Sequence, residues 1–172
     1  MKKLITIALC IILAVGLLSS CRNGNDPASP TDDGTESSTV ALRPEEWTLI
    51  RPQSPALMAE INRLKRAWES ATGETIALKT DADPEGAHEI LIGETSRAAS
   101  KSARDALQGD RYALAHDGNH IVIVGSCDAL TAEGVRYFAE TYVASAPALT
   151  LPDGLQYVSE ELDVVSLTNG TR

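Results

Sequence analysis

The chain has 172 residues, a length that suits one domain and falls short of the roughly 200 residues that an eight-stranded α/β barrel needs. Acidic residues outnumber basic ones by 24 to 15, for a formal net charge of -9, so binding to nucleic-acid phosphates is disfavoured. Aromatic residues make up only 4% and there are three cysteines, which leaves few rings for stacking and excludes a disulfide framework.

Residues 1–20 have the layout of a secretory signal peptide. A basic head, Lys2 and Lys3, precedes a mostly apolar stretch from 4 to 18, which is shorter than the 18 or more residues that suggest a membrane-spanning helix. Ordinary cleavage prefers small residues one and three positions before the cut. A cut after Ser20 would place the bulky Leu18 at the third position, which disfavours that route.

The run Leu18-Ser19-Ser20-Cys21 resembles the lipobox of bacterial lipoprotein precursors, in which leucine and two small residues precede a cysteine. In that family diacylglycerol alkylates the thiol, and cleavage makes the cysteine the new amino terminus. The resemblance implies that Cys21 carries lipid and anchors the chain at the extracytoplasmic face of the cell membrane. The alternatives are an uncleaved anchor and a chance cysteine at an ordinary cleavage site.

After the anchor, residues 22–44 are rich in Asn, Asp, Gly, Pro, Ser and Thr. Such a stretch buries too little apolar surface to offset its ordering entropy, so we expect residues 21–44 to be the lipidated cysteine and a disordered tether. A tether of this length would reach roughly 75 Å when fully extended. The alternative is a poorly ordered terminus whose length has no role.

A regular apolar pattern from residue 45 to about 160 predicts one folded domain. Thr48–Ile50 is β-prone, Ser54 and Pro55 suit a helix cap and first turn, and Gly73 suits a helix end. Between them runs a stripe with helical spacing, interpreted as core: Leu57, Ile61, Leu64, Trp68 and Ala71.

Further along, residues 75–79 predict a half-buried strand, and Glu89–Gly93 predicts a central strand because it is continuously apolar. Thr95 or Ser96 would cap a second helix that runs to about Gln108.

The clearest local signal is Asp117-Gly118 between two β-prone runs. This pair favours a two-residue type I′ hairpin, in which Leu114 would face Ile121. Asp128 would then cap a third helix that ends near Pro147.

This order of elements predicts an α+β fold (an α/β sandwich), a single domain with a mixed sheet and about three helices packed on it. Residues 161–172 form a tail or, through the β-prone Val164–Leu167, an edge strand.

Two stretches resemble a known domain. Residues 89–97 are similar to the signature E-I-L-I-G-x-T-x-R, and residues 112–143 resemble its matching hairpin and helix, in which an I-x-I-x-G run precedes a small, acidic-capped helix. Both occur in the non-catalytic domain that precedes the barrel in family 20 β-N-acetylhexosaminidases and family 67 α-glucuronidases. Bacterial surface lipoproteins reuse this domain. The resemblance implies the fold and a glycan-associated surface setting.

The catalytic activity of those enzymes does not carry over with the resemblance. Their acid/base chemistry comes from the barrel, where hexosaminidases use an adjacent Asp-Glu pair. This sequence contains no Asp-Glu dipeptide and has no room for a barrel. We therefore expect a non-catalytic chain.

The histidines and cysteines do not indicate a metal-binding or catalytic site. His116 and His120 are four residues apart, but the hairpin places them on opposite faces of the sheet, and His88 begins a strand elsewhere. A zinc site is disfavoured because it needs three or four convergent ligands. Cys127 is interpreted as a small residue near a helix start, since nothing in the sequence specifies a base for it.

The carboxylate groupings Glu45-Glu46, Glu160-Glu161 and 81–85 are interpreted as solvated, since none has the spacing of a calcium loop. With no phosphate-binding glycine loop either, we expect no catalytic, metal or cofactor site. Trp47 and Tyr157 are candidates for stacking on a sugar.

These patterns together predict a lipid-anchored extracytoplasmic protein with a non-catalytic accessory domain, a spacer or a binding module. Its expected partners are the membrane, through the lipid, and a surface glycan or a glycan-processing enzyme. The alternative is a small carbohydrate-active hydrolase whose site is assembled from scattered acidic residues and histidines.

Overall fold

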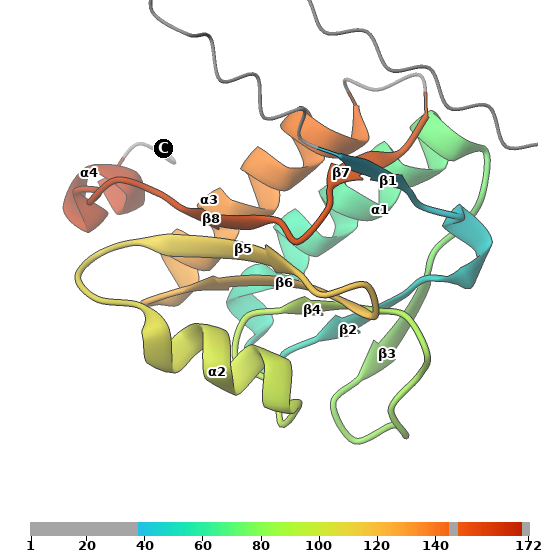
Figure 1. The fold of residues 1–172 in the computed structure, drawn as a ribbon. Coiled ribbons are helices and arrows are strands. Elements are labelled where there is room, and N and C mark those ends of the chain that lie inside the picture. The colour runs from blue at the N-terminus through green and yellow to red at the C-terminus, as the bar shows by residue number, and fades with distance from the viewer. Residues whose placement is uncertain (1–37, 145–147, 170–172) are drawn as a thin grey trace, which may run out of the picture. The chain divides into compact units, whose positions relative to one another are not determined.

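A six-stranded mixed sheet organises the fold, which the computed structural model describes over residues 38–144 and 148–169 (Figure 1). The first four strands in the sheet are parallel, and the last two are antiparallel to their neighbours. In spatial order the strands are β3 (Ala77–Thr80), β2 (Thr48–Arg51), β4 (Glu89–Ile92), β6 (His120–Gly125), β5 (Tyr112–His116) and β8 (Gln156–Val158).

Helices cover both faces of this sheet. α1 (Met58–Thr72) and α3 (Asp128–Phe138) lie on one face and α2 (Ala98–Ala106) on the other (Figure 1). Along β4, Ile90 and Ile92 belong to the core under α1 and α3, whereas Leu91 belongs to the smaller core under α2. The mixed sheet and its helices confirm the predicted α+β class.

The first helical segment starts after Ser54 and ends at Gly73, as predicted, but its first turn is a 3-10 turn and α1 itself begins only at Met58. The Ser54 hydroxyl accepts a hydrogen bond from the Ala56 amide (3.3 Å), and the 3-10 turn η2 (Pro55–Leu57) leads directly into α1. Gly73 ends α1 with a φ of 75°, a conformation that favours glycine. The predicted stripe is buried except for Ala71, which is exposed because the helix end extends beyond the core.

A second, two-stranded sheet joins the start of the domain to its end. β1 (Thr39–Ala41) pairs antiparallel with β7 (Thr150–Pro152), and the 3-10 turn η1 (Pro44–Glu46) follows. Leu42, which lies between β1 and η1, is buried in the main core. The prediction of a disordered tether to Pro44 was therefore wrong for residues 39–44, because the apolar end of that stretch finds a partner in β7.

The C-terminal part also differs from prediction. α3 continues into a π-helical turn, η3 (Ala139–Val143), and Val164–Leu167 lies in a short helix, α4 (Val164–Asn169), instead of an edge strand. The Asp163 carboxylate accepts a hydrogen bond from the Val165 amide (3.0 Å), which starts the helix, and Val164 packs against the core. β8 is the edge strand beside β5.

The β5–β6 hairpin forms with a register two residues away from the predicted one. Leu114 pairs with Ile123 instead of Ile121. The last pair is His116 with Ile121, so residues 117–120 form a loop that is longer than a two-residue type I′ turn. The Asp117 carboxylate accepts the amides of Asn119 and His120 (2.9 and 2.7 Å), which stabilises this longer loop. A shift of two residues leaves every side chain on its predicted face.

The predicted signal peptide, the lipobox Leu18-Ser19-Ser20 and the lipidated Cys21 lie outside the described residues. Among residues 38–144 and 148–169, we find no helix with the length and apolar character needed to cross a membrane.

Candidate functional site

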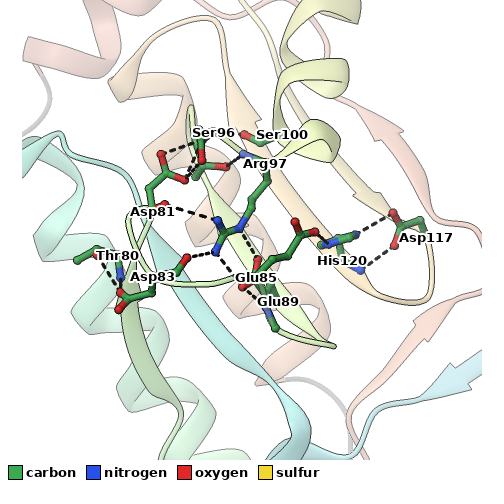
Figure 2. A network of polar contacts seen from close by, with 12 residues as sticks. Thr80, Asp81, Asp83, Glu85, Glu89, Ser96, Arg97, Ser100, Asp117 and His120 are labelled. Carbon is green, nitrogen blue, oxygen red and sulfur yellow. Dashed lines mark hydrogen bonds and ion pairs between the residues drawn. The ribbon is translucent and has the colours of Figure 1, made fainter.

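A buried ion pair lies at the centre of a polar network on the α2 face of the sheet (Figure 2). Arg97 Nε donates to Glu89 Oε2 (2.8 Å) and a terminal nitrogen of Arg97 donates to Glu89 Oε1 (3.1 Å). Glu89 is 1% exposed and Arg97 8%. These residues are the first and last of the E-I-L-I-G-x-T-x-R signature, so its charged ends bind each other.

The acidic loop between β3 and β4 wraps around this arginine. The Asp83 carbonyl accepts from Arg97 (2.9 Å), and the Asp81 carboxylate accepts from the amide and hydroxyl of Ser96 (2.8 and 2.7 Å). Hydrogen bonds from the Thr80 amide and hydroxyl hold the pKa of Asp83 below its ordinary value. Residues 81–85 thus lie in a turn, as interpreted from sequence, and the carboxylates of Asp81 and Asp83 also accept hydrogen bonds that fix the shape of the loop.

His120 extends the network along the sheet. Its Nε2 lies 3.1 Å from Glu85 Oε1 and its Nδ1 lies 3.1 Å from Asp117 Oδ2 (Figure 2). Burial alone would raise the pKa of Asp117, but the hydrogen bonds from the backbone and ring of His120 bring it below its ordinary value.

Glu85, Glu89 and His120 bring potential metal ligands within 4.8 Å of one another. Both carboxylate oxygens of Glu89 already accept hydrogen bonds from Arg97, so a cation there would compete with the guanidinium. The arrangement is best interpreted as an ion-pair network that holds the β3–β4 loop on the sheet.

His116 lies on the opposite face of the hairpin from His120, as predicted, and is 2% exposed. Its ring centroid lies 6.2 Å from that of Trp47, which lies 5.2 Å from His88. A cavity of about 290 Å³ adjoins these three rings beside β1. Trp47 is only 5% exposed, so it has no open ring face for a sugar.

Tyr157 belongs to a different aromatic cluster, which contains all four tyrosines of the chain. Its ring stacks on Tyr137 with centroids 4.8 Å apart and planes at 10°, and Tyr112 lies 6.0 Å away. Burial, followed by the hydrogen bond with Tyr157, raises the pKa of Tyr112. Tyr157 is half-buried and does not combine with Trp47 into a platform. The sequence offered no signal for this cluster, since its members come from β5, α3, η3 and β8.

A polar crevice of about 450 Å³ lies beyond the carboxyl ends of β2 and β4. The chain leaves these adjacent parallel strands toward opposite faces, to α1 and to α2, and ligands of open α/β sheets bind at such points. The Ser54 hydroxyl donates to Asp128 (2.6 Å) across it. Asp128 was predicted to cap α3, but it is the first residue of that helix and Cys127 holds the cap position. The other polar lining residues are Gln53, Asp81, Glu94, Thr95, Ser96 and Lys101.

Cys127 is exposed and immediately precedes α3, as expected for a residue near a helix start.

Neither a family model nor a curated protein matches the sequence. Among solved structures, the chain is similar to BtGH115A, a family 115 4-O-methyl-α-glucuronidase with specificity for decorated arabinogalactans, at a TM-score of 0.50 and 13% identity. That match covers 71% of this chain and 18% of the enzyme. The glycoside hydrolase CpGH84D matches at 0.49 and 16% identity, over 73% and 21% of the two chains. The family 20 chitobiase of Flavobacterium johnsoniae matches at 0.45 and 14% identity, over 72% and 19%.

The chain thus spans about a fifth of the length of each enzyme that it matches. At these identities the likeness concerns the fold alone. Of the three matches described, only that to the α-glucuronidase reaches a TM-score of 0.50, so the statement about the fold rests on it. These structural neighbours are glycoside hydrolases, and the fold that this chain shares with part of one of them agrees with the resemblance predicted from residues 89–97 and 112–143.

Proposed function

We propose that this chain is a lipid-anchored extracytoplasmic protein whose folded domain is a non-catalytic, glycan-associated accessory module. The observation that carries the proposal is the fold that it shares with part of a glycoside hydrolase. In the described domain, the charged residues of the E-I-L-I-G-x-T-x-R signature, Glu89 and Arg97, pair with each other, which fits a role in the fold rather than in bond cleavage. The lipobox supports the anchor.

The anchor predicts that Cys21 is lipidated when the full chain is expressed in a bacterial host. Wild-type chain should incorporate radiolabelled palmitate, and Cys21→Ser should lose the label because its hydroxyl does not replace the thiol nucleophile. Cys10→Ser and Cys127→Ser are matched controls and should keep the label. Equal labelling of Cys21→Ser and wild type would exclude the anchor.

The glycan contact is proposed for the crevice beyond β2 and β4. Sugar hydroxyls both donate and accept hydrogen bonds, and the crevice offers acceptors at Asp81 and Asp128 and donors at Gln53 and Lys101. Three carboxylates against one lysine line it, so a neutral saccharide fits better than a uronate.

On a glycan array, the full chain should therefore bind neutral oligosaccharides. A Gln53→Ala/Lys101→Ala variant should bind about tenfold more weakly, because it loses two donors. Arg66→Ala, an exposed position on α1, is the control and should bind like wild type. Binding that the crevice variant leaves unchanged would place the contact elsewhere. Hydrolysis of aryl glycosides that is abolished by one carboxylate substitution would instead favour a small hydrolase.

A further inference from the structure

The segment from β1 to η1, residues 39–46, is attached to the domain by few contacts, and we call it the strap. β1 forms its one strand pairing with β7, and all three of its residues are exposed. Beyond this pairing, Leu42 donates its amide to the Leu149 carbonyl (2.8 Å) and buries its side chain. A segment with so little buried surface opens at a lower free energy than the core.

The strap lies over a buried histidine. His116 lines the 290 Å³ cavity together with Val40, Leu42 and Trp47. His116 is 2% exposed, and neither of its ring nitrogens has a hydrogen-bond partner; the Nδ1 atom of His88 beside it is also buried and unpartnered. The Pro152 carbonyl, in the strand that pairs with β1, faces the His116 ring and favours its protonated form. Protonation would therefore place a charge in a buried site beneath the strap, where burial costs more than the nearby acceptor and carboxylates return.

Two opposing effects act on the pKa of His116, and burial, which lowers it, outweighs the nearby groups that raise it. Burial lowers the pKa of His116, whereas Asp117, Asp153 and the Pro152 carbonyl raise it and His88 lowers it further. On the strap itself, Arg43 and Glu46 border the cavity, and Glu46 lies 3.9 Å from His88 Nε2. The facing titratable and charged groups are thus Arg43, Glu46, His88, Asp117 and Asp153.

The sign of the pH dependence follows from this direction. The closed strap holds His116 with a lowered pKa, and opening the strap returns the ring to water. Closure is therefore favoured above the ordinary histidine pKa of about 6.5, and it weakens as the pH falls through that value toward the lower pKa of the closed state.

We propose that the strap is a pH-sensitive element, closed over the buried His116 at neutral pH and released by mild acid. Release frees residues 39–46 and lengthens the chain before the core by up to about 27 Å. For a chain anchored at Cys21, acid would thus let the domain move further from the membrane. This consequence depends on the proposed anchor, whereas the strap itself does not.

Hydrogen exchange of the full chain in detergent, read by mass spectrometry and corrected for intrinsic rates, tests the proposal at pH 7.5 and pH 5.0. We expect protection in peptides covering 39–46 to fall roughly tenfold at pH 5.0, while β4 and β6 keep theirs. His116→Gln should remove most of this pH dependence. The matched control is His120→Gln, because His120 has carboxylate partners on the opposite face, and it should behave like wild type.

A second measurement keeps the test valid if His116→Gln folds poorly. The chain has three histidines, so the ring resonances of His116 can be followed by NMR in wild type, and their midpoint should coincide with that of strap opening. Different midpoints would overturn the proposal. So would an unchanged pH dependence in a folded His116→Gln variant, or loss of protection in β4 and β6 together with the strap.

Discussion

Replacement of Arg97 by methionine is expected to lower the free energy of unfolding by about 3–5 kcal/mol. The change leaves the Glu89 carboxylate, 1% exposed, without its two hydrogen bonds from the guanidinium. It also removes the donor to the Asp83 carbonyl, so the β3–β4 loop should loosen. Urea denaturation of the full chain, followed by circular dichroism, measures the loss.

Two further variants separate this effect from an ordinary loss of charge. Glu46→Gln breaks the ion pair between Arg43 and Glu46, whose side chains are 74% and 40% exposed, and should cost less than about 1 kcal/mol. In Glu89→Gln/Arg97→Met the buried charge is gone, so part of the lost stability should return. If Arg97→Met cost no more than Glu46→Gln, the network would not be structural, and its carboxylates would have to be reconsidered for chemistry.

The parts of the fold that could be predicted from sequence are those with local causes. Ser54-Pro55 and Gly73 delimit a helix because a cap, a fixed φ and a left-handed residue act on their immediate neighbours. The continuous apolar run at 89–92 predicted a central strand because only a strand buried on both faces tolerates it.

The errors have causes distant in the sequence. Val164–Leu167 is β-prone, yet it is helical because Asp163 initiates a turn and the core offers an apolar rim. Residues 39–41 lie at the more apolar end of a stretch whose overall composition predicts a tether, and their strand exists only because β7, more than 100 residues later, pairs with them. Composition alone gives no information about such a partner.

In the candidate site, too, the features with local causes could be predicted from the sequence, and those that depend on distant residues could not. The signature at 89–97 contains both ends of the buried ion pair, but its spacing does not show that a strand and a turn bring Glu89 and Arg97 together. The crevice follows from the order of strands and helices once the sheet order is known. Trp47 was chosen for its chemistry, and its burial could not be read from neighbours that are polar in sequence.

The glycine of the I-x-I-x-G run should be the least replaceable residue of the second signature. A Cβ on Gly125 would lie 2.4 Å from the Thr131 amide nitrogen and 2.6 Å from the Leu130 carbonyl carbon. Both are backbone atoms of α3, which crosses the end of β6 here, and the Gly125 amide donates to the Thr131 hydroxyl (2.9 Å). Relief requires α3 to move away from the sheet, so no rotamer change suffices.

Gly125→Ala is therefore expected to cost about 3 kcal/mol or more in the free energy of unfolding, or to prevent folding, as read from soluble yield and the urea midpoint. Gly86→Ala is the matched control: its nearest contact would be a side-chain oxygen of Glu89 at 3.5 Å, and its φ is not positive, so it should change stability by less than about 1 kcal/mol. Equal effects at the two positions would mean that α3 does not rest on Gly125. The close approach of α3 to β6 is the packing reason for a glycine at this position. Without a large effect of Gly125→Ala, that reason would fail, and the glycine of the signature would need another explanation.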